Sequence, residues 1–461
     1  MSLLVVGCSR VQLSKVRGKR QFRPIGEGSH TGASVANILF DVLKSYDVLD
    51  CIQGVTTDNA AANFTMMSSL ETLIPGFDYK NKHFVCFAHI LNLAVQDFMK
   101  VVEPNRNNLN IENDFEEEDD INDTDLDFSS PVSKIRHLVK KIKNSEQMQL
   151  KLNSACVAVN CKMTMPKLDV PTRWHSTFEM LTWGLSVKNA LNIFCDNIEN
   201  INNCKILDKE WVLINKFCQY LRSFKTLSSI LEGEKYCTPP LVVIGINLLL
   251  DKLEIWAHEL DNKVDRDATD EQIIYCIQAA RDKILKHYNK TNWIYCIVLI
   301  LDPRHKIEAF SSTSWGKLLQ SEAVQKFEEI FKANYFNKSE NDLQNPKPGP
   351  SQSLKKEDND FDLDITYLFK KTNTDNSESW KYETEKYLNE PRAENSENVL
   401  EWWSRRENVY PSLSKMAKDF LGTPATSVPA ERLFSRAALT ITKSRNRLGD
   451  DSIRSLMCLN S

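Results

Sequence analysis

Between residues 34 and 100 the apolar residues change their spacing from segment to segment, and this alternation limits the folds open to the chain. Helical spacing marks the segments "SVANILFDVLKSY", "NAAANFTMMSSLETL" and "ILNLAVQDFM". Between them lie "CIQGVTTD" and "KHFVCFAH", which have the pattern of short buried strands. Because strands that alternate with helices build a helix-covered sheet, this pattern predicts an α/β core.

The middle of the chain has a different pattern. From about residue 176 to residue 336 nearly every segment shows helical periodicity, as in "WVLINKFCQYLRSFKTLSSIL". This block predicts an all-α domain next to the α/β core. Residues 105–130 are acidic and poor in apolar residues, and residues 337–362 are of low complexity, so both stretches are predicted to be disordered.

Composition excludes several classes of protein. The chain has 461 residues, enough for two or three domains, and no apolar run reaches the roughly 18 residues of a membrane span. We therefore expect a soluble intracellular protein without a membrane partner. The 12 cysteines include no Cys-x2-Cys pair, which favours reduced thiols and argues against a self-contained zinc finger.

The charge of the chain is nearly balanced, with a formal net charge of -4. Such a value does not by itself indicate a nucleic-acid-binding protein. Residues 10–23 nevertheless hold six basic residues and no acid, which fits either a phosphate-binding arm or a solvated surface.

Two carboxylates stand at positions where chemistry is possible. Asp58 follows a predicted strand, where it could bind Mg²⁺ or Mn²⁺ or could cap the next helix. Glu431 stands in the first turn of a helix predicted in "SVPAERLFSRAALTITKSRNRL", followed by a basic run. It could be a helix-dipole partner, a salt-bridge anchor or a metal ligand.

Two residue pairs leave similar alternatives open. Cys86 and His89 lie one helical turn apart. They could form half a zinc site, or they could be a packing pair beside a crevice. Arg173 and Trp174 could contact a phosphate and a base, or could pack in a domain interface.

Five motifs occur together and in order, and their combination resembles the hAT superfamily of DNA transposases. The resemblance is closer to the host proteins derived from these transposases, the BED-type zinc finger group. It extends from about residue 28 to the end of the chain. The motifs are "TTDNAAANF", "CFAHILNLAVQD", "PTRWHSTFEML", "LDPRHK" and "PATSVPAERLFSRAALTITKSRNRLGDDSIRSLMCLN".

The resemblance implies an RNase H-like core interrupted by a large α-helical insertion domain. It assigns residues 1–175 to the first part of an incomplete core and residues 176–395 to the insertion. Residues 396–461 would complete the core and form the C-terminal dimerisation segment.

The resemblance also implies roles for individual residues. Family members use two Asp and one Glu to hold two divalent metals, and Asp58 and Glu431 match the second Asp and the Glu. Cys86 and His89 match a structural pair near the site. The expected DNA-binding residues are Arg173, Trp174, Arg432, Arg436, Lys443, Arg445 and Arg447. The expected dimerisation residues are Leu413, Met416, Phe420, Leu433, Phe434 and Ile441.

The chain departs from the family at the first Asp, since residues 1–40 contain no Asp at all. The family's N-terminal finger is missing as well, so we expect an N-terminally truncated relative. Two acids hold two metals poorly, which predicts an inactive enzyme that needs no cofactor and keeps at most a vestigial, weak Mg²⁺ or Mn²⁺ site.

These observations predict a nuclear protein that forms a homodimer or higher homo-oligomer, with DNA as a candidate partner. The alternatives are an active metal-dependent transposase or nuclease, and a protein-interaction scaffold that does not bind DNA.

Overall fold

The computed structural model describes ten parts of the chain, and these are mostly helical with one small sheet. They are residues 4–8, 31–49, 52–104, 130–170, 173–233, 236–288, 293–311, 316–336, 379–428 and 432. Most of the two stretches that were predicted to be disordered lies outside these residues, but Ser130 is ordered and caps a helix.

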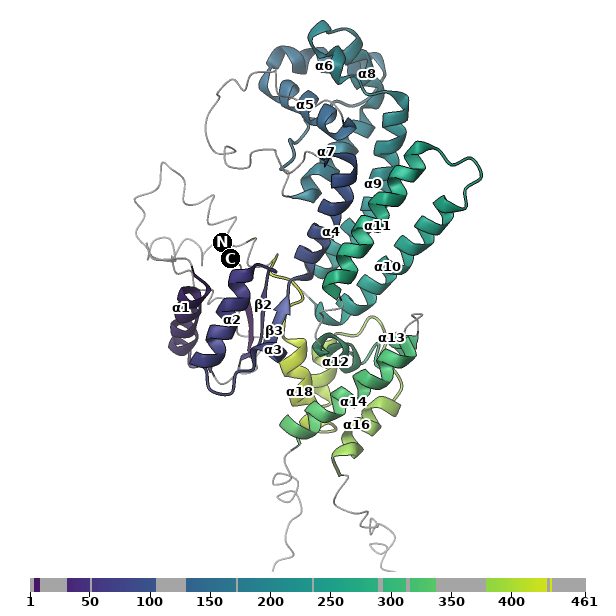
Figure 1. Ribbon diagram of the computed structural model, residues 1–461. Coiled ribbons are helices and arrows are strands. Elements are labelled where there is room, and N and C mark those ends of the chain that lie inside the picture. Colours follow the sequence, from purple (N-terminus) through teal and green to yellow (C-terminus); the bar gives the residue numbers. More distant parts are fainter. Residues whose placement is uncertain are drawn as a thin grey trace, which may run out of the picture. The chain divides into compact units, whose positions relative to one another are not determined.

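The chain divides into two compact units (Figure 1). Unit 1 contains Met1–Asn292 and Thr423–Ser461, and unit 2 contains Trp293–Gly422. The chain therefore enters unit 2 once and then returns to unit 1. The domain boundaries at 175 and 395 were derived from sequence motifs and remain predictions.

The sheet of unit 1 has three strands in the order β1 (Leu4–Cys8), β2 (Ile52–Thr57) and β3 (His83–Val85). Both strands expected between residues 34 and 100 are thus confirmed as β2 and β3. The pairing of β2 with β3 is parallel, whereas β1 runs antiparallel to β2 with Leu4 opposite Thr57. The carboxyl ends of β2 and β3 therefore lie at the same edge of the sheet.

Helices α1 (Gly32–Ser45) and α2 (Ala61–Leu73) lie side by side next to the strands, and the short α3 (Tyr79–Lys82) precedes β3 (Figure 1). Close approach of α1 to α2 depends on Gly32, because a Cβ atom there would lie 2.3 Å from the carbonyl oxygen of Ala62. The buried apolar residues of this layer are Ala36, Leu43, Ile52, Val55, Met66, Met67, Leu70, Ile74 and Phe77.

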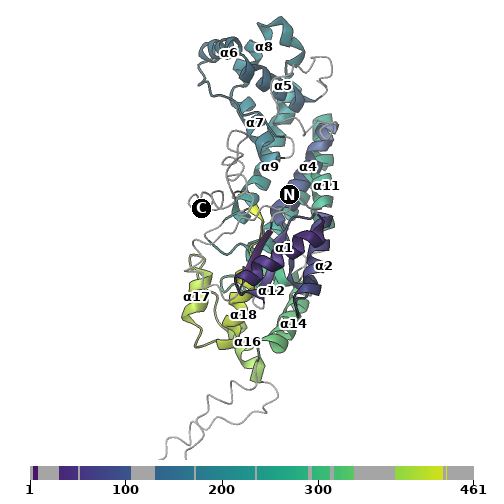
Figure 2. The same ribbon diagram turned by 90° about the vertical axis from the view of Figure 1, so that its left-hand side faces the viewer.

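The other helices of unit 1 pack together, and α4 (Phe87–Val102) leads into them directly from β3. α4 runs beside α9 (Asp208–Leu231) and α11 (Ala268–Tyr288) in both views (Figure 1, Figure 2). The ring of Phe98 packs there against Phe217, with 4.9 Å between centroids. The remaining helices are α5 (Pro131–Asn144), α6 (Glu146–Ala158), α7 (Trp174–Ser186), α8 (Lys188–Asp196), the 3-10 helix η4 (Glu199–Cys204) and α10 (Pro239–Asp261). Of the helices of unit 1, only α8 to α11 lie wholly within the block predicted to be all-α, which also extends into unit 2.

All regular secondary structure in the described parts of unit 2 is helical. The core of unit 2 contains a lysine, Lys306, whose ammonium group donates hydrogen bonds to the carbonyl oxygens of Tyr387 and Glu390, each at 2.5 Å. Burial lowers the pKa of Lys306 to about 8.

The helices of unit 2 are α12 (Ile294–Leu301), α13 (Glu308–Ser311), α14 (Gly316–Asn334), α16 (Ser379–Asn389), α17 (Val399–Arg405) and α18 (Pro411–Leu421).

No helix in the described ranges is both long enough and apolar enough to cross a membrane.

A buried ionic network joins the end of α4 to the start of α7 through Arg136 on α5. The guanidinium of Arg136 donates hydrogen bonds to both oxygens of Asp169, at 2.7 and 2.9 Å, and also pairs with Glu103. Asp169 additionally accepts a hydrogen bond from the hydroxyl of Thr177, at 2.7 Å. Burial alone would lower the pKa of Arg136, but the hydrogen bonds to Asp169 and Glu103 raise it, so the cation is held firmly.

Replacing Arg136 by Met should lower the free energy of unfolding by about 3 kcal/mol, because two carboxylates would stay buried without their cation. Chemical denaturation followed by tryptophan fluorescence measures this loss. The surface variant Arg281→Met, which breaks a pair with the exposed Glu254, is the control and should cost less than about 1 kcal/mol. Adding Glu103→Gln and Asp169→Asn to Arg136→Met should recover part of the loss; equal effects of the Arg136 and Arg281 variants would contradict this account.

Candidate functional site

Asp58 stands directly after β2, at the edge where the parallel strands end. Its carboxylate accepts hydrogen bonds from the backbone N–H of Ala60, at 3.1 Å, and from the side-chain amide of Asn63, at 2.5 Å. Because α2 begins at Ala61 and its N-cap is Ala60, Asp58 is not the N-cap considered from the sequence. Its carboxylate instead orders the turn that leads from β2 into α2.

His83, at the start of β3, adds no positive charge beside Asp58 at neutral pH. Its Nε2 atom lies 2.8 Å from the hydroxyl oxygen of Thr57, and Phe64 packs edge-on against its ring. Burial lowers the pKa of His83 from its usual 6.5 to about 4, so the imidazole is neutral.

Cys86 and His89 stand at the start of α4, on the same edge of the sheet. Cys86 is fully buried, and its sulfur accepts a hydrogen bond from the backbone N–H of Ser427, at 3.2 Å. His89 is half-buried in the first turn of the helix. Within the described ranges, no three His, Cys, Asp or Glu side chains gather in a group that could hold a metal ion.

Residues 424–427 return from unit 2 and lie across the ends of β2 and β3. The hydroxyl of Thr56 donates to the carbonyl of Pro424, at 2.8 Å, and the backbone N–H of Phe87 donates to the carbonyl of Ala425, at 3.2 Å. The backbone N–H of Ala425 in turn donates to the hydroxyl of Thr238, at 3.3 Å. The segment that precedes Glu431 in the sequence is thus fixed beside Asp58 and Cys86.

Glu431 itself lies outside the described residues. So do Leu433, Phe434, Arg436, Ile441, Lys443, Arg445 and Arg447. Arg432 is described, and one of its guanidinium nitrogens lies 3.3 Å from a carboxylate oxygen of Glu232, at the end of α9.

The side chains of Arg173 and Trp174 lie in different environments, one exposed and one buried. Trp174 is 1% exposed and its ring stacks on that of His175, with 3.9 Å between centroids, so the indole offers no face to a base in this conformation. The packing interpretation therefore describes Trp174. Arg173 is exposed at the N-cap position of α7, where its side chain could reach a phosphate.

The strand next to β2 brings no acid to Asp58. β1 consists of "LVVGC", and its antiparallel register places Leu4 opposite Thr57 and Cys8 opposite Ile52, at the far end. A two-metal site needs several carboxylates around both ions. In the part of the chain that the structure describes, the residues at this edge do not fit such a site.

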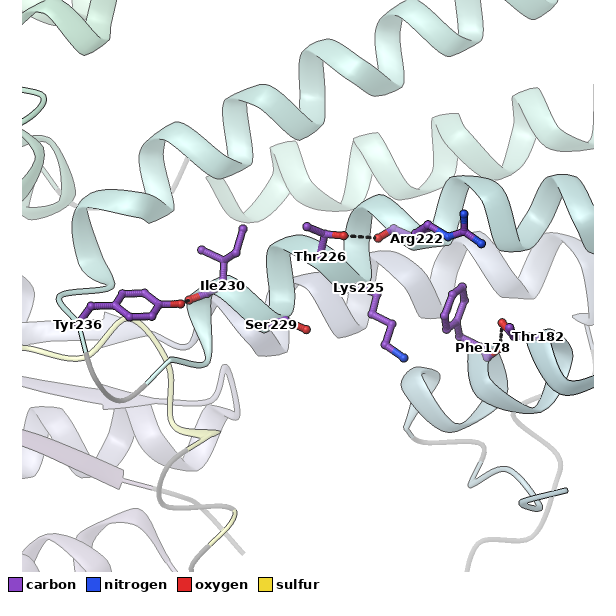
Figure 3. Close-up of a pocket in the computed structure, with 8 residues that line it drawn as sticks. All are labelled: Phe178, Thr182, Arg222, Lys225, Thr226, Ser229, Ile230 and Tyr236. Carbon is purple, nitrogen blue, oxygen red and sulfur yellow. Dashed lines mark hydrogen bonds between the residues drawn. The ribbon is translucent and has the colours of Figure 1, made fainter. Parts of the chain in front are cut away.

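Sequence reasoning missed a groove between α7 and α9 (Figure 3). Its volume is about 590 Å³. The lining residues are Phe178, Thr182, Arg222, Lys225, Thr226, Ser229, Ile230 and Tyr236. Polar residues spaced three or four apart along α9 were the available signal, but they also fit an ordinary solvated helix face.

Two family descriptions match the chain. The hAT family C-terminal dimerisation region matches residues 383–461, and the ZBED1 RNase-like helical domain matches residues 120–220. The predicted dimerisation segment began at residue 396, so the matched region starts earlier. The chain is therefore a hAT transposase-like protein with a C-terminal dimerisation region.

Curated relatives agree with this class. A Talaromyces stipitatus protein named as a transcriptional regulator, tpeD, is 26% identical over 95% of this chain and 48% of its own length. A Zea mays protein named as an AC transposase is 24% identical over 94% of this chain and 51% of its own length. The zinc finger BED domain-containing protein RICESLEEPER 1 of Oryza sativa subsp. japonica is 22% identical, over 93% of this chain and 58% of its own length.

The chain is thus similar over most of its length to proteins named as transposases and to BED-type zinc finger proteins. It spans about half the length of the curated relatives it matches.

Part of the matched dimerisation region is buried inside unit 2. Leu413 and Met416 are fully buried inside unit 2, where α18 packs against α12, and Phe420 is half-buried. Leu413 and Met416 are therefore core residues of their own subunit and present no surface to a partner. The resemblance implies that both residues form a dimer surface, but unit 2 itself covers that face of α18.

Stability should fall as the pH drops from 6.5 to 4, because the unfolded chain then protonates His83 while the folded chain keeps it neutral. Titration of the His83 ring by NMR should give a midpoint near 4, and His83→Gln should flatten the dependence of unfolding free energy on pH within that window. An NMR midpoint near 6.5 would contradict the burial described here.

Proposed function

We propose that this chain is a transposase-derived protein that forms homodimers and binds DNA in the nucleus without cutting it. The proposed loss of catalysis rests on the surroundings of Asp58. Its carboxylate accepts hydrogen bonds from Ala60 and Asn63, and the adjacent strand β1 contains no acid. Catalysis by two metals requires ligands that neutralise both ions, and Asp58 with Glu431 supplies too few. The metal site would be a remnant, and no cofactor would be needed.

The proposed architecture is an incomplete RNase H-like core at residues 1–175, with a helical insertion at 176–395 and a returning segment at 396–461. The continuous path from β3 into α4 and the return of residues 424–427 to the sheet edge support this arrangement. Cys86 would then be structural, since its sulfur binds the returning backbone.

DNA contacts are proposed for Arg173 and for the basic residues of the C-terminal segment. Arg173 is exposed, and Arg432 is joined to α9 through Glu232. The net charge of -4 favours the alternative of a scaffold that does not bind DNA. Binding of random duplex DNA separates the two, because phosphate contacts weaken steeply as salt is raised and a scaffold would not bind even at low salt.

Dimerisation predicts a sedimenting species of twice the 53.0 kDa chain mass at micromolar concentration. The variant Phe434→Asp should shift it to the monomer, because a buried charge disrupts an apolar interface. Leu150→Asp changes an exposed leucine on α6 and serves as the control that stays dimeric. Sedimentation of the wild-type chain as a clean monomer would contradict the proposal.

Incubation with Mn²⁺ and labelled duplex DNA should produce no cleavage above background for the wild-type chain. Asp58→Asn and Glu431→Gln should give the same result, because no catalytic site remains for them to remove. Cleavage by the wild type that disappears in both variants would favour the alternative of an active transposase or nuclease.

A further inference from the structure

We propose that the groove between α7 and α9 binds the phosphate backbone and one unstacked base of single-stranded DNA (Figure 3). The inference rests on the proposed DNA binding and names its ligand and its residues. None of the groove residues was among the DNA contacts expected from the sequence.

Two cations on α9 provide the charge. Arg222 is exposed and forms no ion pair with any residue that the structure describes. Lys225 lies three residues further along, with its ammonium nitrogen 4.9 Å from the centroid of the Phe178 ring and 3.5 Å from Glu179. A carboxylate oxygen of Glu179 also lies 4.0 Å from the ammonium nitrogen of Lys167. The cations therefore outnumber the single acid at this end of the groove. Pairs this exposed are weak, and a phosphate can replace the carboxylate.

Hydroxyl groups and an aromatic ring continue the lining past the cations. Ser229 makes no side-chain hydrogen bond with the described residues, so its hydroxyl can donate to a phosphate oxygen. The Tyr236 side chain is 48% exposed and its hydroxyl donates to the carbonyl of Ile230, at 2.6 Å. This bond holds the ring in place, and a fixed exposed ring is the platform on which an unstacked base can lie.

The groove ends near Arg432. Glu232, at the end of α9, lies between Tyr236 and Lys225 in the sequence and pairs with Arg432 at 3.3 Å. That pair compensates the negative charge at this end.

The lining favours nucleic acid over an acidic peptide. Phe178 is 6% exposed and is covered by Lys225, so the exposed apolar surface of the lining is limited to Ile230 and the Tyr236 ring. Phosphates, by contrast, need cations and hydroxyl donors, and a base needs one ring face.

The test compares binding of fluorescein-labelled oligothymidine by fluorescence anisotropy between about 50 and 200 mM salt. The double variant Arg222→Gln with Lys225→Gln should bind on the order of tenfold more weakly at the lowest salt. Its slope of log affinity against log salt should be shallower by about 1.4, from two phosphate contacts at about 0.7 each. The matched control Lys151→Gln with Lys209→Gln removes two exposed charges from α6 and α9 outside the groove and should match the wild type.

A second pair of variants tests the stacking ring. Tyr236→Ala should lose about fivefold or more in affinity, whereas Tyr236→Phe keeps the ring but not the bond that holds it and should lose clearly less. Thermal melting of each variant confirms that the chain still folds, since all the substituted side chains are at least partly exposed.

The outcomes separate the groove from the wider proposal. Absence of binding by the wild type at low salt would overturn both the DNA-binding function and the groove. If the wild type binds and the groove variants show the same affinity and the same salt dependence, the groove proposal alone is overturned. A double variant that keeps DNA binding but loses binding of an acidic peptide would also overturn it, in favour of a protein partner.

Discussion

The hydrogen bonds that hold residues 424–427 across the ends of β2 and β3 are the constraint on which unit 1 depends. The bond from Thr56 to Pro424 spans 368 residues of sequence, and the bond from Ser427 to Cys86 spans 341. Unit 1 is therefore complete only when the chain has passed through unit 2 and returned. The same bonds fix residues 424–427 next to the strand end that carries Asp58.

A sheet edge can retain this geometry even if its catalytic chemistry is lost, as proposed above. The carboxylate of Asp58 has a structural task, because it binds the turn into α2 through Ala60 and Asn63. In the same way, Cys86 binds the returning backbone. Contacts to phosphate need cations and donors and do not need a metal pair, so the proposed DNA binding is compatible with the proposed loss of cleavage.

The helices and strands that could be predicted are those that local patterns of apolar residues determine. The apolar periods of "CIQGVTTD" and "SVANILFDVLKSY" predict β2 and α1, and both form at those places. Roles that depend on burial could not be predicted in this way: Trp174 and Leu413 lie on faces that only the packed units cover. The groove could not be predicted either, since Arg222 and Phe178 line one groove only when α9 packs on α7.

Metal binding by the intact chain tests the central claim, which is that two acids remain where three are needed. Titration with Mn²⁺ followed by electron paramagnetic resonance counts the bound ions and detects magnetic coupling between neighbours about 4 Å apart. We predict at most one weakly bound, uncoupled ion per chain, lost in the variant Asp58→Asn. Two coupled ions per chain bound at micromolar concentration would contradict the account.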